Sequence, residues 1–331
     1  MDKNHPDVRF GKTGILLINL GTPDSTNWWD IRKYLKEFLS DRRVIEVNPI
    51  IWQIILNLFI LTFRPSRTAH AYKKIWRKDT NESPLLFFTR NQATKLNSKI
   101  GNEKVIVDFA MRYGNPSIKS RLDKLKEEGC EHIVIMPLYP QYAAATTATV
   151  CDEVYRSLMS MRWQPSLQVI PHYESEPKYI DALVESIEKK IKEINWKPDL
   201  IISSYHGIPK SYFDKGDPYQ CYCQKTTRLM SEKFNKVSIK TTFQSRFGPQ
   251  EWLKPYTDKT LESLPKEGIK NLLIICPGFA SDCVETLEEI NIAGRETFIN
   301  SGGKNFDLIP CLNDSSKHID LFEYLVKRYV F

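Results

Sequence analysis

The stretch "DLIISSYHGIPKS", residues 199–211, shows a pattern that occurs twice in the chain. It begins with an apolar run of strand length and ends with a glycine, one further residue and a proline. In the first half, "GILLINLGTPDS", residues 14–25, follows the same order. A near-continuous Val, Ile and Leu run of this length is typical of a parallel strand that is covered on both faces. The repeat predicts that each half of the chain is built around such a strand.

Further apolar runs alternate with helical patterns, such as residues 117–129 and 181–194. This alternation is typical of doubly wound parallel sheets in α/β proteins. The predicted strands are residues 14–20, 104–111, 132–138, 167–171, 199–205, 238–244 and 271–277.

A second, longer repeat supports a duplication. Residues 111–137 and 245–277 both run from an arginine, an aromatic residue and a glycine through a helix to an apolar strand. We therefore expect two similar Rossmann-like domains, at residues 12–172 and 173–331, with a C-terminal helix that could pack back on the first. A ligand would lie between them, outside the carboxyl ends of the strands.

The composition is that of an ordinary globular protein, with 41% apolar and 26% charged residues. The net charge of +7 is spread along the chain, so nucleic acid is not an expected partner, whereas anionic ligands or an anionic membrane face are. Seven cysteines and no pattern of a signal peptide favour a cytoplasmic protein. The chain has no second pair to join Cys221 and Cys223 in a zinc site, and no Gly-rich nucleotide motif.

The most apolar segment is "IIWQIILNLFILTF", residues 50–63. It is shorter than the roughly 20 residues that cross a bilayer, and Gln53 and Asn57 interrupt it. A buried amphipathic helix and a lip that touches a membrane or an apolar ligand are both consistent with this pattern.

A candidate site lies at the carboxyl ends of two predicted strands. His206 follows the strand at residues 199–205, and its imidazole could accept a proton near neutral pH or bind a metal. The alternative is a structural histidine. Gly207 beside it allows a close approach of the backbone.

The second part of this candidate site is "CPGFASDCVETLEEI", residues 276–290. A helix beginning near Ser281 would place Glu285 and Glu289 on one face, with Glu288 beside them. Such a face is either simply solvated or a ladder of carboxylates that passes a cation inward. A histidine with carboxylates suits a divalent first-row ion such as Fe²⁺.

The motifs "SYHGIP", "KGDPY", "TFQSRFGPQEWLKPYT" and "CPGFASDCVETLEEI" resemble those of the ferrochelatase family. These enzymes insert Fe²⁺ into protoporphyrin IX and release two protons to give protoheme. "GILLINLGTPDS", "FLSDRRVIE" and "PLYPQYAAATTATV" resemble the same family, so the resemblance runs from about residue 12 to 325. It is to the bacterial branch that uses protoporphyrin, and it implies a chelatase-like pair of Rossmann-like domains around the porphyrin.

The resemblance also implies the roles of individual residues. His206 and Glu285 would be catalytic, and Glu289 would join them in binding the incoming Fe²⁺. Residues 50–63 would form a lip over the mouth of the cleft. The implied porphyrin contacts are Leu20, Arg112, Tyr113, Ser245, Trp252 and Phe279.

Iron would be a substrate, so no permanently bound cofactor is expected. Animal members of the family hold a [2Fe–2S] cluster with cysteines of a C-terminal extension, but no cysteine follows Cys311 here. Some members carry a histidine where Cys283 stands. The expected partners are protoporphyrin IX and Fe²⁺, with a peripheral contact to the inner face of the cytoplasmic membrane. The alternatives are a chelatase for cobalt or nickel, a non-catalytic porphyrin or heme carrier, and a nucleotide-binding α/β module.

Overall fold

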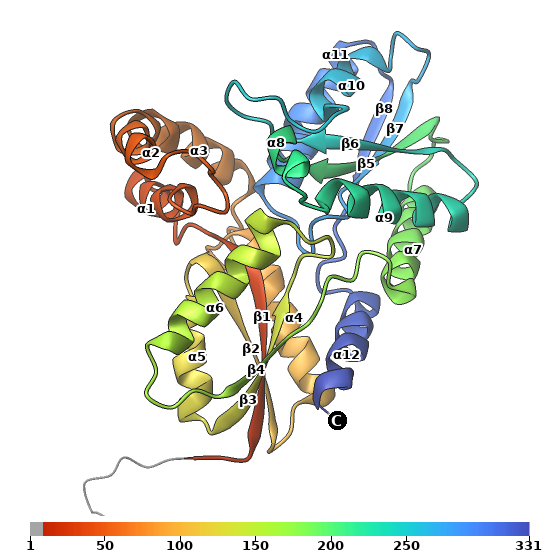
Figure 1. Ribbon diagram of the computed structural model, residues 1–331. Helices are drawn as coiled ribbons and strands as arrows, with labels where there is room; N and C mark the ends of the chain where they lie inside the picture. The colour runs from red at the N-terminus through yellow and green to blue at the C-terminus, as the bar shows by residue number, and fades with distance from the viewer. Residues whose placement is uncertain (1–8, 331) are drawn as a thin grey trace, which may run out of the picture.

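The computed structural model describes residues 9–330 and contains two four-stranded sheets whose strands all run parallel (Figure 1). The strand order is β2-β1-β3-β4 in the first sheet and β6-β5-β7-β8 in the second. The two orders are the same when each sheet is numbered from its own first strand, which confirms the predicted duplication. The strands are β1 (Lys12–Thr22), β2 (Val105–Gly114), β3 (Cys130–Pro137), β4 (Ser166–Val169), β5 (Leu200–His206), β6 (Ile239–Gln244), β7 (Asn271–Ile275) and β8 (Asn305–Ile309).

Helices connect the strands and cover both faces of each sheet (Figure 1). The α-helices are α1 (Trp28–Leu39), α2 (Pro49–Ile55), α3 (Leu61–Ile75), α4 (Pro84–Ile100), α5 (Ile118–Glu127), α6 (Thr149–Met159), α7 (Pro177–Glu193), α8 (Lys210–Asp214), α9 (Tyr219–Lys233), α10 (Thr257–Ser263), α11 (Arg295–Asn300) and α12 (Ser316–Val330). Three segments are π-helices: η1 (Leu56–Ile60), η2 (Ala144–Ala148) and η3 (Glu285–Gly294).

The central strand β1 explains why the apolar runs of this sequence are continuous. Ile15 and Leu17 belong to a core that includes α4 and α12, whereas Leu16 and Ile18 pack with α5 and α6. Successive side chains of a strand point to opposite faces, so helices on both faces require apolar residues at every position.

The core on the α4 face of β1 continues into the second half of the chain. It contains Ile201 of β5, Leu273 of β7 and residues of α7 and α12. At its edge, Lys99 of α4 pairs with Asp320 and Glu323 of α12. The two halves therefore share one packed interior, with the C-terminal helix α12 lying against both α4 and α7 (Figure 1).

We propose residues 12–172 and 173–331 as the two domains. The first sheet ends at Val169, and the helix α7 that leads to the second sheet begins at Pro177. The segment between them crosses from one domain to the other.

The sequence analysis located seven of the eight strands and missed β8. This strand has five residues and lies at the edge of the second sheet. Its apolar residues are interrupted by Asp307, whose carboxylate lies near Lys190 and Arg295. A short edge strand with a charged residue at its centre does not show the continuous apolar run that identified the others.

The apolar segment at residues 50–63 lies in a composite helix, Pro49–Ile75, formed by α2, η1 and α3. This helix is long and apolar enough to cross a membrane by length and composition, and it is longer than the apolar segment itself. Leu56 and Leu61 are buried against α1, but Ile50, Leu58 and Phe63 are each more than 60% exposed. The structure therefore favours a lip over a buried core helix.

Candidate functional site between the two domains

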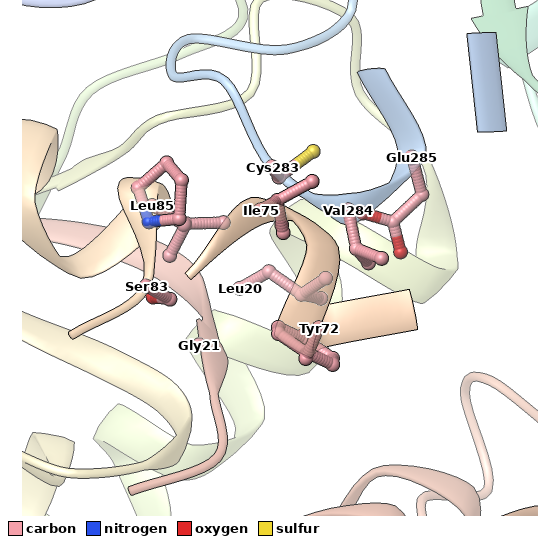
Figure 2. Close-up of a pocket in the computed structure, with 10 residues that line it drawn as sticks. Leu20, Gly21, Tyr72, Ile75, Ser83, Leu85, Cys283, Val284 and Glu285 are labelled. Carbon is pink, nitrogen blue, oxygen red and sulfur yellow. The ribbon is translucent and has the colours of Figure 1, made fainter. Parts of the chain in front are cut away.

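A narrow cavity, too small to hold a water-sized sphere, lies between the domains at the carboxyl ends of the strands (Figure 2). The first domain contributes the end of β1, the end of α3 and the start of α4, and the second contributes the start of η3. The residues around it are Leu20, Gly21, Tyr72, Ile75, Ser83, Pro84, Leu85, Cys283, Val284 and Glu285. The cavity is thus mainly apolar, with one carboxylate from the second domain.

His206 ends β5 and places its imidazole at the carboxyl edge of the second sheet. Its Nδ1 lies 2.6 Å from the carbonyl oxygen of Gly207, which assigns the proton of a neutral ring to Nδ1. Nε2 then carries the lone pair that can accept a proton or bind a metal. A side chain at position 207 would place its Cβ 3.0 Å from the carbonyl oxygen of Gln244, so any residue other than glycine would require the end of β6 to shift by a few tenths of an ångström.

Glu285 and Glu289 lie in η3, and the expectation of a helix from near Ser281 is wrong. The helix begins at Val284 and has π geometry over residues 285–294. The Asp282 carboxylate accepts hydrogen bonds from the Thr286 hydroxyl and the Asn313 amide, and it holds the residues before the helix in a loop. π-Helical segments are rare, and they occur frequently at functional sites.

The Glu289 carboxylate is held by the end of β6. The backbone N–H of Ser245 donates to one oxygen over 2.7 Å, and the Ser245 hydroxyl donates to the other over 2.5 Å. Ser245 adopts a positive φ of 65°, which turns both donors toward the carboxylate. The side-chain amide of Gln244 donates to the carbonyl oxygen of Glu285 over 2.9 Å and ties the same strand to the helix.

The pKa of Glu289 is shifted by several of the other candidate residues, which therefore lie near it. Burial raises this pKa above its ordinary value, while the hydrogen bonds of Ser245 and the charge of His206 lower it. The charge of Glu285 raises it again. His206 and both carboxylates therefore share one electrostatic environment. Within residues 9–330, however, no three His, Cys, Asp or Glu side chains lie close enough together to hold a metal ion.

Three of the residues expected to contact a porphyrin form walls near this site. Leu20 lies at the end of β1, where Gly21 has a φ of 114° and approaches the backbone of Tyr113 too closely for any side chain. Trp252 is largely buried, and its ring lies 6.4 Å from that of His206. Phe279 packs near Cys283 and Leu85, at the end of β7.

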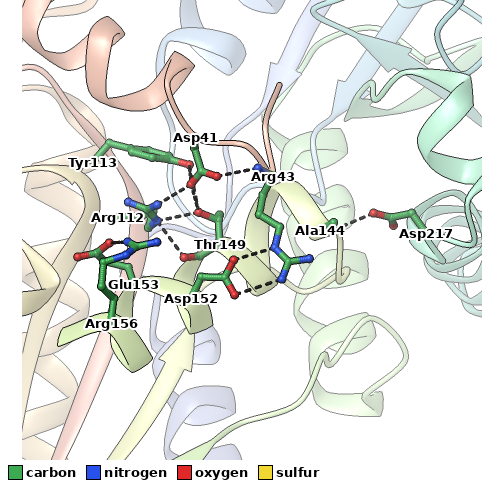
Figure 3. Close-up of polar contacts among 10 residues, drawn as sticks. All are labelled: Asp41, Arg43, Arg112, Tyr113, Ala144, Thr149, Asp152, Glu153, Arg156 and Asp217. Carbon is green, nitrogen blue, oxygen red and sulfur yellow. Dashed lines mark hydrogen bonds and ion pairs between the residues drawn. The ribbon is translucent and has the colours of Figure 1, made fainter. Parts of the chain in front are cut away.

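Arg112 and Tyr113 occupy a different position, inside the first domain (Figure 3). The Arg112 guanidinium pairs with Asp41 and donates to Thr149, and the Tyr113 hydroxyl also donates to Asp41. Burial alone would raise the pKa of Asp41, but the hydrogen bond from Thr149 and the charge of Arg112 hold it below its ordinary value. Both side chains are at most 8% exposed and neither lines the described cavity.

The sequence analysis missed several residues of the cavity, among them Tyr72, Ile75 and Leu85. It also missed Arg64, whose guanidinium lies 5.0 Å from the ring of Phe247 and has no ion pair within the described part of the chain. Burial lowers the pKa of Arg64, and the charge of Glu285 opposes this effect. These residues belong to α3 and α4, outside the strand ends at which the sequence analysis looked for chemistry.

Comparisons with known proteins agree with this geometry. The family model described as Ferrochelatase matches residues 12–330. Ferrochelatase of Allorhizobium ampelinum is 54% identical over 331 residues, which cover 99% of this chain and 96% of that protein. Ferrochelatase of Rhizobium meliloti is 54% identical over 333 residues, with 99% and 98% covered.

Solved structures with a similar fold include SirB from Bacillus subtilis with Fe³⁺, at a TM-score of 0.57 and 12% identity, with 96% of each chain covered. CbiX, the terminal enzyme of siroheme biosynthesis in denitrifying bacteria, has a TM-score of 0.53 at 11% identity, with 96% of this chain and 100% of that chain covered. These structures share the two-domain Rossmann-like fold. Because the family model spans nearly the whole sequence and the relatives are more than half identical, the chain belongs to the ferrochelatase family.

Proposed function

We propose that the two domains have different roles in the reaction of this family. In this reaction Fe²⁺ enters protoporphyrin IX, two protons leave and protoheme forms. The chain is a metal chelatase of heme biosynthesis by its family. The observation that carries the proposal is the arrangement of the two domains. Apolar side chains dominate the first domain's side of the cleft, while the second domain supplies His206, Glu285 and Glu289.

A flat porphyrin points its nitrogen lone pairs inward, so the ring must be buckled before a metal can bind. Rigid side chains on either side, Leu20, Phe279 and Trp252, would hold the large apolar disc and offset the strain of buckling with binding energy. The lone pair on Nε2 of His206 would take a pyrrole proton or make the first contact with the metal. We propose Arg112, Tyr113 and Ser245 as contacts only after a rearrangement, because their side chains are engaged with Asp41 and Glu289.

The two glutamates would act in sequence. Glu289 is held by Ser245 and would attract or relay the incoming cation. Glu285 lines the cavity and would act in the insertion step. Oxygen and nitrogen ligands hold Fe²⁺ less firmly than thiolates do, so such a site can transfer the metal to the porphyrin.

The carboxylates of the porphyrin need a cationic partner. Arg64 is suited to this role because its guanidinium is largely buried near the cleft and no carboxylate pairs with it among residues 9–330. Guanidinium and carboxylate groups form strong paired hydrogen bonds in such surroundings.

We also propose that iron is present only as substrate and that no [2Fe–2S] cluster is bound. All seven cysteines are free thiols, and five of them are buried. Burial raises the pKa of Cys276, Cys283 and Cys311, which disfavours the thiolate that an iron–sulfur cluster requires.

The lip at residues 50–63 would make a peripheral contact with the inner face of the cytoplasmic membrane, with the rest of the protein in the cytoplasm. Its exposed apolar side chains, such as Ile50, Leu58 and Phe59, supply a surface for lipid tails. The exposed Arg67 follows in α3 and suits anionic head groups.

The decisive experiment uses purified protein, anaerobic Fe²⁺ and protoporphyrin, with the absorbance change of metallation followed over time. Parallel reactions with Co²⁺ and Ni²⁺ test the metal. Faster metallation by either of these ions would contradict the assignment to iron. Porphyrin binding without metallation would indicate a carrier.

A further inference from the structure

The third glutamate of η3, Glu288, is paired across the cleft. Its Oε1 lies 2.8 Å from Nζ of Lys74. Lys74 belongs to α3 of the first domain, and Glu288 belongs to η3 of the second. The side chains are 36% and 20% exposed, so the pair lies at the surface and closes one side of the space between the domains.

The same two elements line the cavity beneath this pair. Tyr72 and Ile75 of α3 flank Lys74 in sequence, and Glu285 is the first residue of η3 (Figure 2). This cavity is too narrow to hold even a water-sized sphere, whereas pockets that hold drug-sized ligands span roughly 300–1,000 Å³. If the porphyrin lies here, as the proposed function places it, α3 and η3 must separate to admit it, and this movement would break the pair.

The segment that leads into the composite helix is held more firmly. The Tyr212 hydroxyl of α8 donates to the carbonyl oxygen of Val44 and accepts from the N–H of Glu46, each over 3.0 Å. Tyr212 is only 7% exposed, and Lys215 adds an ion pair to Glu46. Two partly buried hydrogen bonds to one tyrosine cost more to break than a single partly exposed ion pair, which contributes little. The composite helix would therefore pivot at this end and open at Lys74.

We propose that Lys74 and Glu288 form a clasp that keeps the empty cleft closed, and that porphyrin binding must open it. The inference rests on the proposed function in one respect, the position of the porphyrin between the domains. Both residues act as positioning residues and take no part in the chemistry. A binding-competent state that is only partly populated lowers the apparent affinity and the rate of association in proportion.

The test compares two lysines of one helix. Lys74→Glu replaces the attraction with repulsion, and Lys73→Glu makes the same charge change at an adjacent exposed residue that has no ion pair among residues 9–330. Association of protoporphyrin without iron is followed by stopped-flow fluorescence. We expect the rate to be about two- to fivefold higher in Lys74→Glu than in Lys73→Glu, as the opening of one partly exposed ion pair allows.

Two further measurements separate a clasp from a general effect of charge. The double variant Lys74→Glu with Glu288→Lys restores an attractive pair and should return the rate to that of the natural protein. About 0.5 M salt screens the pair and should remove the difference between the natural protein and Lys74→Glu. Lys74→Met and Lys73→Met repeat the comparison with a milder change if the glutamate variants do not fold.

Equal association rates in the Lys74 and Lys73 variants would overturn the clasp, and so would a double variant that stays as fast as Lys74→Glu. These readouts require only porphyrin binding. A protein that binds protoporphyrin but metallates none would refute the proposed function and leave the test of the clasp intact. The rate of metallation in a single turnover, started from bound porphyrin, should stay unchanged in Lys74→Met, because the clasp acts before the chemical step.

Discussion

His318 should make the folded protein sensitive to acid, and the size of the effect follows from its surroundings. The imidazole is fully buried at the start of α12 and packs against Phe322, with ring centroids 4.2 Å apart. Its Nδ1 lies 2.6 Å from the carbonyl oxygen of Asn313, and its Nε2 has no hydrogen-bond partner among residues 9–330. Gln92 of α4 donates to the same carbonyl oxygen over 2.8 Å, so the histidine lies where the two domains are joined.

Burial lowers the pKa of His318 from 6.5 to about 4, because the charged ring would lose its hydration. Between these two values the unfolded chain binds a proton and the folded protein does not. Acidification therefore favours unfolding. The contribution of His318 to stability is complete above pH 6.5, decreases as the pH falls toward 4 and changes no further below that. At pH 5 the loss relative to pH 7 is about 2 kcal/mol.

The assay is urea unfolding at pH 7 and pH 5, followed by tryptophan fluorescence. The natural protein should lose about 2 kcal/mol more between these pH values than His318→Gln, which cannot be charged. His70→Gln, a change at an exposed histidine of α3, should retain the full loss. The same pH dependence in the natural protein and His318→Gln would show that the buried ring does not titrate as reasoned.

Four predictions concern the reaction and its setting. His206→Ala should lower metallation by orders of magnitude and leave folding and porphyrin binding intact; normal turnover would refute its role. Glu285→Gln should lower kcat strongly, whereas Glu289→Gln should mainly raise the KM for Fe²⁺ and leave the KM for porphyrin nearly unchanged. Equal, minor effects of both variants in steady-state kinetics would mean that the two glutamates form only a solvated face. The lip at residues 50–63 should make only a peripheral contact with membranes, so the protein should be recovered mainly in the soluble fraction. Retention in membranes after alkaline carbonate washing would contradict a peripheral contact. Protein purified without added porphyrin should contain no stoichiometric iron and sulfide, so two of each per chain would establish a cluster.

The fold could be predicted from the sequence because buried parallel strands leave a strong local signal. Every residue from Ile15 to Ile18 is buried, on one face or the other, so the run is continuous and easily recognised. The edge strand β8 has Asp307 at its centre and gives no such signal. His206 was located for the same reason as the strands, since it ends one of them.

Other parts of the site depend on contacts that no local pattern records. The π geometry of η3 is accompanied by hydrogen bonds from Gln244 and Asn313, which are 41 and 31 residues away from their partners. The pairing of Arg112 with Asp41 joins residues 71 positions apart. A motif identifies which residues are present at such places, but the direction of each side chain is decided by packing between elements that are distant in sequence.

The duplication allows residues at matching positions on the two sides of the cleft to be compared, and these residues differ in chemistry. In the repeated motif, Leu20 at the end of β1 occupies the position of His206 at the end of β5. A π-helix follows the third strand of each sheet, η2 in the first domain and η3 in the second.

When the prolines at positions 137 and 277 are aligned, Thr149 corresponds to Glu289. In the first domain the hydroxyl of Thr149 donates to Asp41, and the charge of this buried carboxylate is balanced by Arg112. In the second domain Glu289 keeps its carboxylate beside His206 and Glu285. The same backbone frame thus presents an apolar wall on one side and a base with two carboxylates on the other. Under the proposed function, a flat ligand held between them would meet the proton acceptor and the metal ligands on one face only. We therefore propose that the metal approaches from the second domain.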